Sequence, residues 1–489
     1  HLTREQAFLG WFIVGNVFNF WSSYYIFRRF NFSIIASGIG AFIYAFGLPA
    51  LSKEAHAQLL YRFAVPLSFF SMYQFLQRNR LIDIVRTIFW LIIQFFCSIY
   101  LGVFLIYLLG ALFISFFFLN RKSHRKQFKN ILTKHFNIAH WISAILLIVL
   151  LSLLSALLYQ YQTVSSQYGF TRSVAEIQSM LPRVSSYLMS DHSTLSGWIG
   201  GYIPPFHMRQ EHQMFFGIGV WILGLLGCWY VYQNASNEML GQLALWSLTI
   251  LFILTISING YSIYRLLLYL PGISSVRAVS RVVLVMLFPI AILAAIAIDK
   301  TLKQLKTSPI RCLFLFVLIP LALIESIFYH PYSTQVSKWI DRQAQLKQLL
   351  PAVISKDNIF FATGKPGDYQ DGVIELDAMI LAQDMRLPTL NGYSGNFPPG
   401  HLDPYPCISF QNRLDSYFNL FKDSNLKIDS LAKRVALLPL YVCPVTSAII
   451  TDKIIDKEVA SQIKLSAIGE IKPPNLYVTV NIKNEGQYF

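Results

Sequence analysis

The side chains that could carry chemistry gather in a few short stretches. The clearest is Arg209-Gln210-Glu211-His212, which places a guanidinium, a carboxylate and an imidazole directly before a long apolar run. Glu211 is the candidate catalytic residue, because general acid–base catalysis needs a titratable group within reach of the reacting hydroxyl. An Arg–Glu ion pair beside an interfacial histidine explains the same residues without catalysis, and both interpretations stay open.

A second stretch carries two arginines four residues apart, Arg277 and Arg281. In a helix this spacing places both guanidinium groups on one face. Guanidinium groups form paired hydrogen bonds with phosphate, so the spacing predicts a phosphate or pyrophosphate site. An interfacial amphipathic helix whose arginines bind lipid phosphates without specificity is the alternative.

Further basic residues near the predicted membrane surface could contribute to the same phosphate-binding site. They are His56, Arg62, Arg172 and Arg209. For His56 and Arg62 the alternative is a polar loop whose arginine reaches the lipid headgroups.

A polar loop near the C-terminus could bind a sugar. It contains Asn391, Tyr393, Ser394 and Asn396 and is followed by Pro398-Pro399-Gly400. Its amides and hydroxyls could hydrogen-bond to a sugar on which the aromatic ring stacks, although a purely structural Ω-loop fits equally well. Residue spacings typical of metal ligands are missing from the sequence, so no metal site is predicted.

The elements that must position these residues are mostly membrane helices. The 489 residues are 54% hydrophobic and only 13% charged, about half the charged fraction of a soluble domain. Apolar runs close to the length that crosses a bilayer recur before position 330. We predict about ten spans: Ala7–Phe27, Ser33–Leu51, Leu60–Phe75, Ile82–Cys97, Leu101–Leu119, Ile138–Tyr159, Met214–Tyr232, Leu240–Ile258, Val282–Ile298 and Arg311–Phe328.

The net charge of +15 is explained by topology rather than by an acidic partner. Every second loop is basic, and the run 121–134 between two spans contains no acid. Basic loops stay on the cytoplasmic side, so the N-terminus, the loops 161–213 and 259–281 and the C-terminal part are predicted to lie outside. This placement argues against nucleic acid as a partner and leaves the lipid bilayer as one.

Residues 330–489 differ in character from the transmembrane domain 1–329. Short alternating strands are predicted at Asn358–Ala362, Gly372–Leu376, Ala448–Thr451 and Leu476–Asn481, separated by turns. We therefore predict a mainly α-helical polytopic membrane protein followed by a small α/β extracytoplasmic domain. Cys407 and Cys443 could pair in an oxidising compartment or remain free thiols.

Diffuse motifs over nearly the whole chain resemble a family of membrane enzymes. They are Ala55-His56-Ala57-Gln58-Leu59-Leu60 with Pro66-Leu67, Cys97-Ser98-Ile99-Tyr100-Leu101-Gly102, Glu211-His212 before Phe215-Phe216-Gly217, Leu270-Pro271-Gly272-Ile273 with Arg277 to Arg281, and Asn391-Gly392-Tyr393-Ser394-Gly395-Asn396. The chain is similar in these to bacterial GT-C superfamily glycosyltransferases, in a branch with a C-terminal periplasmic domain.

The resemblance implies a multi-pass protein of the bacterial inner membrane. It would transfer a sugar from a polyprenyl-phosphate donor to an envelope glycan, lipid or protein on the outer face, with Arg277 and Arg281 at positions where the branch is basic. The family's key acid usually lies in the first outer loop, of which only Glu5 remains here. Because the chain begins at His1 without an initiator methionine and on the predicted outer side, it is expected to be N-terminally incomplete, with the base upstream of His1; an ordinary signal peptide is the alternative. No cofactor is implied with certainty, and a divalent cation stays open.

A transporter, flippase or assembly factor for envelope lipids or polysaccharide is the rival hypothesis. Such a protein needs a polar path across the bilayer. The side chains that could line one are Asn16, Asn19, Ser22, Ser23 and Gln94. A continuous passage through the membrane would favour transport, and a cavity confined to the outer half would favour the enzyme.

Overall fold

The computed structural model describes residues 2–119, 138–170, 172–233, 238–270, 272–303, 309–331, 333–350, 354–363, 371–394, 413, 434–439, 463–472 and 475–484. Two compact units make up the chain. The first is His1–Thr163 with Thr171–Ser333, and the second is Val164–Phe170 with Thr334–Phe489.

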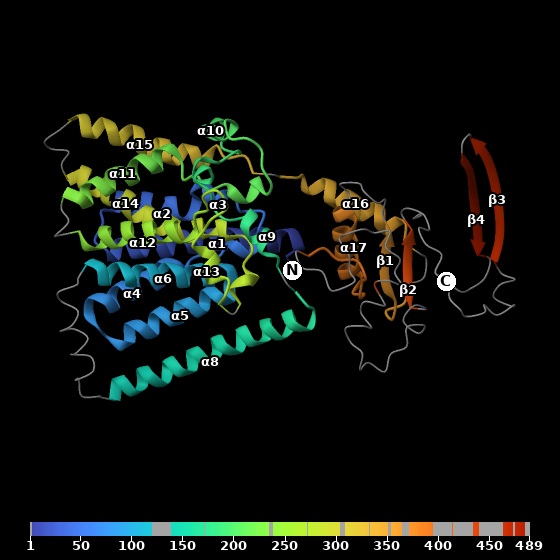
Figure 1. The fold of residues 1–489 in the computed structure, drawn as a ribbon, viewed down its shortest axis with the longest axis horizontal. Coiled ribbons are helices and arrows are strands. Elements are labelled where there is room, and N and C mark those ends of the chain that lie inside the picture. Colours follow the sequence, from blue (N-terminus) through green and yellow to red (C-terminus); the bar gives the residue numbers. More distant parts are fainter. Residues whose placement is uncertain are drawn as a thin grey trace. The chain divides into compact units, whose positions relative to one another are not determined.

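The first unit is a bundle of α-helices, shown in Figure 1. The long helices are α1 (Arg4–Arg29), α2 (Ile34–Phe46), α4 (Ala64–Arg78), α5 (Leu81–Cys97), α6 (Ile99–Leu119), α8 (Ile138–Gln167), α11 (Ile218–Gln233), α12 (Met239–Thr255), α14 (Val283–Lys303) and α15 (Pro309–Ile327). Short helices are α3 (Leu48–Leu51), α9 (Val174–Ser179), α10 (Gly197–Gly201) and α13 (Tyr264–Leu267), with 3₁₀ turns η1 (Ala57–Leu59), η2 (Val184–Leu188), η3 (Arg209–His212), η4 (Ile273–Ser275) and η5 (Val279–Val282).

Each predicted apolar run overlaps one of these helices, which confirms the helical class. Among the described residues, four segments are both long and apolar enough to cross a membrane: Ile34–Leu51, Ile99–Leu119, Ile138–Gln167 and Val279–Lys303. Three shorter apolar helices, Ile218–Gln233, Met239–Thr255 and Leu315–Ile327, accompany them. The chain therefore has the helices of a membrane protein, and the number of ten spans stays a prediction.

The core of the bundle is built around α14. Its apolar window is buried along its whole length, and it packs against α2, α11, α12 and α6. Gly227 of α11 permits the closest approach, because a Cβ atom there would lie 2.1 Å from the carbonyl oxygen of Leu293. At the other extreme, α8 is exposed along most of its apolar length, as expected for a helix that faces lipid.

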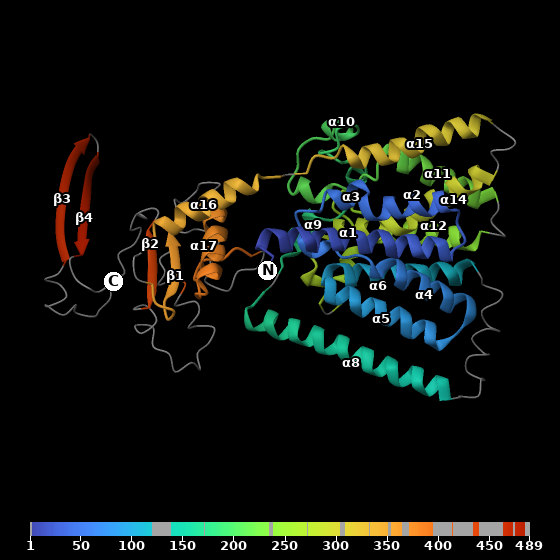
Figure 2. The same ribbon diagram turned by 180° about the vertical axis from the view of Figure 1, so that it is seen from behind.

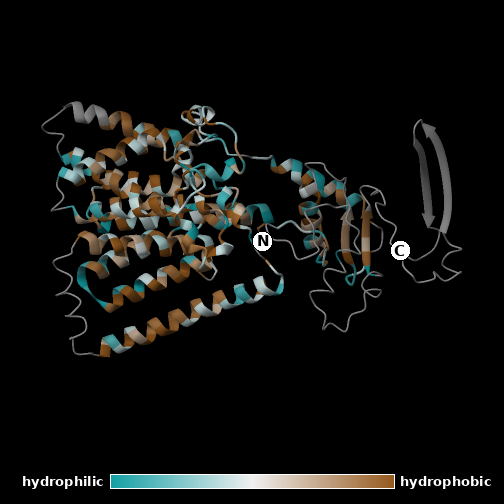
Figure 3. Cartoon of the chain, viewed as in Figure 1, coloured by the Kyte–Doolittle hydropathy of each residue, from teal (hydrophilic) through white to brown (hydrophobic). Residues whose placement is uncertain are grey.

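The two ends of the bundle differ. The short helices α3, α9, α10 and α13 lie at one end, which we call the loop-rich end (Figures 1 and 2). The connections near residues 28–33, 78–81 and 300–303 lie at the opposite end, which we call the arginine end. Apolar residues dominate the helices between these ends, as Figure 3 shows. The functional residues predicted in the first 329 positions belong to the loop-rich end.

The second unit contains helices and strands. Its elements are α16 (Val336–Gln348), β1 (Ile359–Thr363), α17 (Asp371–Met385), β2 (Val435–Pro439), β3 (Ile463–Lys472) and β4 (Asn475–Asn484). β1 pairs in parallel with β2, from Ile359 beside Val435 to Thr363 beside Pro439, and β3 pairs antiparallel with β4, from Ile463 beside Asn484 to Lys472 beside Asn475. The strands predicted at Asn358–Ala362 and Leu476–Asn481 are confirmed, and the α/β domain as a whole stays a prediction.

One predicted strand is wrong. Gly372–Leu376 lies in the helix α17. The helix α17 buries Glu375, Asp377, Ala378, Leu381 and Ala382. They recur at three- and four-residue spacing, the period of a helix rather than of a strand. The strand predicted at Ala448–Thr451 lies outside the described residues, as do Cys407 and Cys443.

Candidate functional site

Glu211 and Arg281 form a buried ion pair at the loop-rich end. Glu211 lies in η3 and Arg281 in η5, 70 residues further along the chain. Arg281 donates from Nη2 to Glu211 Oε1 at 2.7 Å and from Nε to Oε2 at 3.1 Å. Both side chains are less than a tenth exposed. The two-bond geometry fixes the guanidinium and the carboxylate in one plane, where the Arg281 guanidinium also lies 5.1 Å from the ring centre of Tyr100.

Lys53 and His56 complete this group, which we call the Glu211 cluster. Lys53, just after α3, places Nζ 3.5 Å from Glu211 Oε2 and donates to the carbonyl oxygens of Gln210 and Glu211. His56, just before η1, has Nε2 at 3.2 Å from Glu211 Oε1 and 3.1 Å from Arg281 Nη2. The cluster thus joins three chain segments that are far apart in sequence.

The Glu211 cluster is net positive. Lys53 and Arg281 face one carboxylate, and His56 adds a further charge when it is protonated. Burial lowers the pKa of Lys53 to about 8 against the raising effect of Glu211, so Lys53 is mostly protonated at pH 7. Burial alone would raise the pKa of Glu211, but hydrogen bonds from His56 and Arg281 and the charge of Lys53 hold it well below its ordinary value. Glu211 is therefore a weak base here.

His56 is the member of the cluster that a ligand can reach. Its side chain is 35% exposed, whereas Lys53 and Arg281 are nearly fully buried. Because Nε2 faces Arg281 and Glu211, the opposite edge of the ring, at Nδ1, is the one left for an incoming group. An anion bound there would sit above the buried charges of Lys53 and Arg281.

A small cavity adjoins the cluster and brings in a carboxylate. Lys53, Glu54, His56 and Arg62 line it, and its volume is about 10 Å³, close to the space of one water molecule. Burial raises the pKa of Glu54 above its ordinary value, against the lowering effect of Arg62. A carboxyl group with a raised pKa accepts a proton more readily, so Glu54 is better suited than Glu211 to act as a base.

Arg62 serves the backbone rather than a ligand. Its guanidinium donates to the carbonyl oxygens of Leu59 and Ala45, and its main-chain nitrogen donates to the side chain of Asn19. Among the described residues the Arg62 Nε finds no hydrogen-bond acceptor.

Arg277 and Arg281 do not share a helix face, so that expectation is wrong. The chain between them is not helical, because Ala278 has φ −91° and ψ 79° and η5 begins only at Val279. Arg277 instead contacts Glu176 of α9 at 3.1 Å, and Arg172 contacts the same carboxylate at 3.4 Å. These two arginines form a partly exposed cluster of their own around Glu176.

Arg209 stabilises the structure of the loop 161–213. It forms a two-bond ion pair with Asp191 at 2.8 and 2.9 Å and donates to the carbonyl oxygens of Gly200 and Ile203. Gln213 contacts the same carboxylate at 2.8 Å. Arg209 is next to the Glu211 cluster in sequence, but its guanidinium is occupied elsewhere.

His212 is a structural histidine. Its Nε2 lies 2.9 Å from the carbonyl oxygen of Ser179, which can only accept, so Nε2 carries the proton. Nδ1 then accepts from the Ser186 hydroxyl at 2.8 Å, and that hydroxyl accepts from the main-chain nitrogen of Arg183. The neutral ring is fully bonded and fully buried. Burial, with the charges of Arg183 and Lys53, lowers the pKa of His212 to about 4.

This pKa predicts an acid-sensitive fold. The pKa of His212 is lower in the folded than in the unfolded chain, so its contribution to stability is complete above pH 6.5 and is lost as the pH falls towards 4. The loss should reach about 3 kcal/mol. Thermal unfolding of the purified protein across this range would measure it. H212N should remove this part of the pH dependence, and the exposed His207 provides the control H207N, which should keep it; identical slopes in both variants would contradict the assignment.

In the second unit, the predicted sugar loop is partly committed to structure. Asn391 is buried, and its amide both accepts from the Ala362 nitrogen at 2.7 Å and donates to the Ala362 oxygen at 2.9 Å. Tyr393 is about half exposed. Ser394 follows it without secondary structure, and Asn396 lies outside the described residues. Asn391 therefore anchors the loop to β1 rather than facing a sugar.

Sequence reasoning missed an ion pair beside this loop. Glu375 of α17 and Arg413 are both almost fully buried, and Arg413 donates to the two Glu375 oxygens at 2.8 and 3.1 Å. Glu375 also accepts from the Gly392 nitrogen at 2.7 Å. Through the Gly392 contact, the ion pair holds this loop against α17. No sequence pattern linked these residues, because they are 38 positions apart.

Lys53 and Glu54 belong to the same sequence stretch as His56 and Arg62, but the sequence interpretation gave neither of them a role. The described residues contain no group of three or more histidine, cysteine or acidic side chains that could hold a metal ion.

Comparisons with protein-family models, with curated proteins and with solved structures found no match for this chain. The likeness to GT-C enzymes therefore stays a prediction, and function must be argued from the site.

Proposed function

We propose that this chain is a membrane glycosyltransferase that takes a sugar from a polyprenyl-phosphate donor at the outer membrane face. Its acceptor would be an envelope glycan, lipid or protein. The observation that carries the proposal is the Glu211 cluster, a net positive site at the end of a bundle of apolar helices. A lipid-linked phosphate has its polar group at the membrane surface, where the end of such a bundle lies, and its hydrocarbon chain in the bilayer.

The Glu211 cluster suits the phosphate group of the polyprenyl-phosphate donor. The partly exposed His56 ring would contact the phosphate, while the buried Lys53 and Arg281 stabilise its charge. In the transfer, the acceptor hydroxyl oxygen bonds to the anomeric carbon as the bond from that carbon to the phosphate oxygen breaks. The phosphate keeps the electron pair, so negative charge develops next to positive side chains that are already in place.

The acceptor hydroxyl must also lose its proton. Glu54 lines the cavity beside His56 and has a raised pKa, so we assign it the role of base. Glu211 instead acts as a positioning residue that holds Lys53, His56 and Arg281 together. The original expectation of Glu211 as the base is not needed in this arrangement.

A transport function has less support. Asn19 and Gln94, which could have lined a polar path, contact the main chain of one segment. Asn19 bonds to Leu60 and Arg62, and Gln94 donates to the carbonyl oxygen of Tyr61 at 2.9 Å. These amides hold residues 60–62, directly after η1. They therefore support the Glu211 cluster and do not line a polar path.

The proposal is tested by transfer in membranes. Membranes from cells that express the chain would be incubated with a polyprenyl-phosphate donor carrying a radiolabelled sugar, and label in lipid, glycan and protein fractions would be counted. Label above that of membranes without the chain is expected. If no donor sugar gives chain-dependent label while the purified chain moves a lipid-linked sugar across vesicles, the chain is a transporter.

Replacing Glu54 by glutamine should lower this transfer by about 10²- to 10⁴-fold, the usual contribution of a general base. The amide keeps the size of the side chain but cannot take a proton. The loss should appear in kcat at unchanged expression. E5Q is the matched control, because Glu5 is an exposed carboxylate in the first turn of α1, and it should leave transfer unchanged. Normal transfer by E54Q would remove Glu54 from the mechanism.

A further inference from the structure

A large cavity opens at the arginine end of the bundle, opposite the Glu211 cluster. Its volume is about 730 Å³, within the range of small-molecule sites. The ends of α1 and α4 line it, together with the start of α12 and one residue of α14. None of its lining residues belongs to the site described above.

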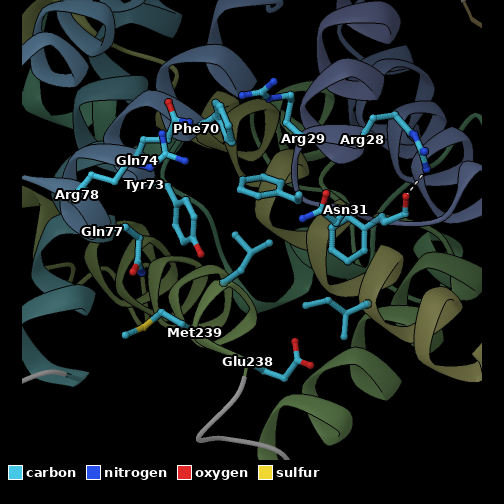
Figure 4. A pocket seen from close by; sticks show the side chains of 14 residues that line it. Arg28, Arg29, Asn31, Phe70, Tyr73, Gln74, Gln77, Arg78, Glu238 and Met239 are labelled. Carbon is cyan, nitrogen blue, oxygen red and sulfur yellow. Dashed lines mark hydrogen bonds between the residues drawn. The ribbon is translucent and has the colours of Figure 1, made fainter. Parts of the chain in front are cut away.

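One face of α4 forms a wall of the cavity. Phe70, Tyr73, Gln74 and Gln77 recur at the spacing of neighbours on a helix surface, and all four line the cavity. This face offers two aromatic rings, two amides and a hydroxyl, and Figure 4 shows the Tyr73 hydroxyl directed into the space. The helix ends at Arg78, because Asn79 adopts the left-handed conformation at φ 52°.

The charges around the cavity are mainly positive. Arg28, Arg29 and Arg78 line it against one acid, Glu238, which is already paired with Lys300. Arg28 donates to the carbonyl oxygen of Phe32, and Figure 4 shows it directed away from the other two arginines. Within the described part of the chain, Arg29 and Arg78 have no carboxylate at ion-pair distance.

Simple topology does not require this arrangement. Basic residues at a cytoplasmic helix end need only lie near the surface. Arg80 does so: like Arg29 and Arg78 it is exposed, but it lies outside the cavity, two residues from Arg78. Arg29 and Arg78, in contrast, come from different helices and converge on one hollow that also presents amides.

We propose that this cavity binds a phosphate-bearing ligand through Arg29 and Arg78. Guanidinium groups match phosphate oxygens in pairs, and the Gln74 and Gln77 amides and the Tyr73 hydroxyl supply further donors. Phe30, Phe32 and Leu240 give the cavity apolar walls next to these groups, which suits the phosphate of an anionic membrane lipid with its glycerol portion. A free phosphate shares the charged part of this chemistry. The site does not depend on the proposed transferase activity.

The test uses the purified full-length chain in a zwitterionic detergent and follows its thermal unfolding. Three probes are titrated: dihexanoyl phosphatidylglycerol, dihexanoyl phosphatidylcholine and inorganic phosphate. The wild type should be stabilised by phosphatidylglycerol at concentrations where phosphatidylcholine has no effect. R78Q should weaken the phosphatidylglycerol dissociation constant at least tenfold, R29Q/R78Q should abolish the effect, and R80Q should change the constant less than twofold.

The outcomes separate the sources of the phosphate. Stabilisation by phosphatidylglycerol alone supports a lipid ligand, and equal stabilisation by inorganic phosphate supports a free one, provided that R78Q weakens either effect and R80Q does not. No stabilisation by either probe, or equal losses in R78Q and R80Q, would overturn the proposal. Because the readout is unfolding, neither result depends on glycosyl transfer.

Discussion

Replacing Arg281 by methionine should sharply lower the proposed glycosyl transfer and destabilise the fold. The variant removes the two hydrogen bonds that Arg281 makes to Glu211 and leaves that buried carboxylate with Lys53 and His56. Breaking one side of a buried ion pair costs up to about 3–5 kcal/mol, and here the remaining carboxylate loses its nearest cation. Loss of a preorganised positive group next to a developing negative charge lowers the rate by about 10²- to 10³-fold. Thermal unfolding and the labelled transfer assay measure the two effects.

The two effects can be separated by a second variant. R281M/E211M removes one charge of each sign and replaces them with apolar side chains of similar length, and such exchanges are often neutral for stability. Lys53 keeps the carbonyl oxygens of residues 210 and 211 as partners. We therefore expect the double variant to recover most of the stability and none of the activity.

A conservative variant tests the role of Arg281 further. R281K keeps the charge but loses the planar fork, so it should restore part of the transfer that R281M loses. Recovery of activity in R281M/E211M along with stability would show that the pair is only structural. That result would remove the main support for an anion-binding site at the Glu211 cluster.

Replacing Glu325 by alanine should have the second largest effect, on stability alone. This glutamate of α15 is buried, and its two carboxylate oxygens accept from the Ile218 and Gly219 nitrogens at 2.9 and 3.0 Å. Those nitrogens belong to the first two residues of α11. At a helix N-terminus the main-chain N–H groups lack partners within the helix, and a negative charge is favoured. Losing two hydrogen bonds to a charged acceptor should cost about 3 kcal/mol, measured by thermal unfolding.

The geometry around Glu325 offers a matched pair of variants. E325Q keeps one carbonyl acceptor and should cost clearly less than E325A. G217A should also destabilise, because Gly217 has φ 104° and an added Cβ atom would lie 2.8 Å from a Glu325 oxygen. If E325A unfolds at the wild-type temperature, the carboxylate is not the cap of α11.

Local rules explain where sequence reasoning succeeded. Apolar runs between polar loops marked every long helix of the first unit, because a bilayer or a core selects the same composition along a whole helix. In the second unit β1 and β4 were found by their alternating pattern. The strand predicted at Gly372–Leu376 failed because five residues are too few to separate the period of a strand from that of α17.

The sequence by itself determined that this chain is a helical membrane protein with its few charged groups concentrated at the helix ends. It marked Glu211 and Arg281 as residues of interest, but it paired Arg281 with Arg277. Only the tertiary structure decided that Arg281 meets Glu211, Lys53 and His56, while Arg277 meets Glu176. The reason is physical: a buried charge requires an opposite charge within a few ångströms. Packing of α3, η3 and η5 decides which partner comes that close, and spacing along the chain does not carry that information.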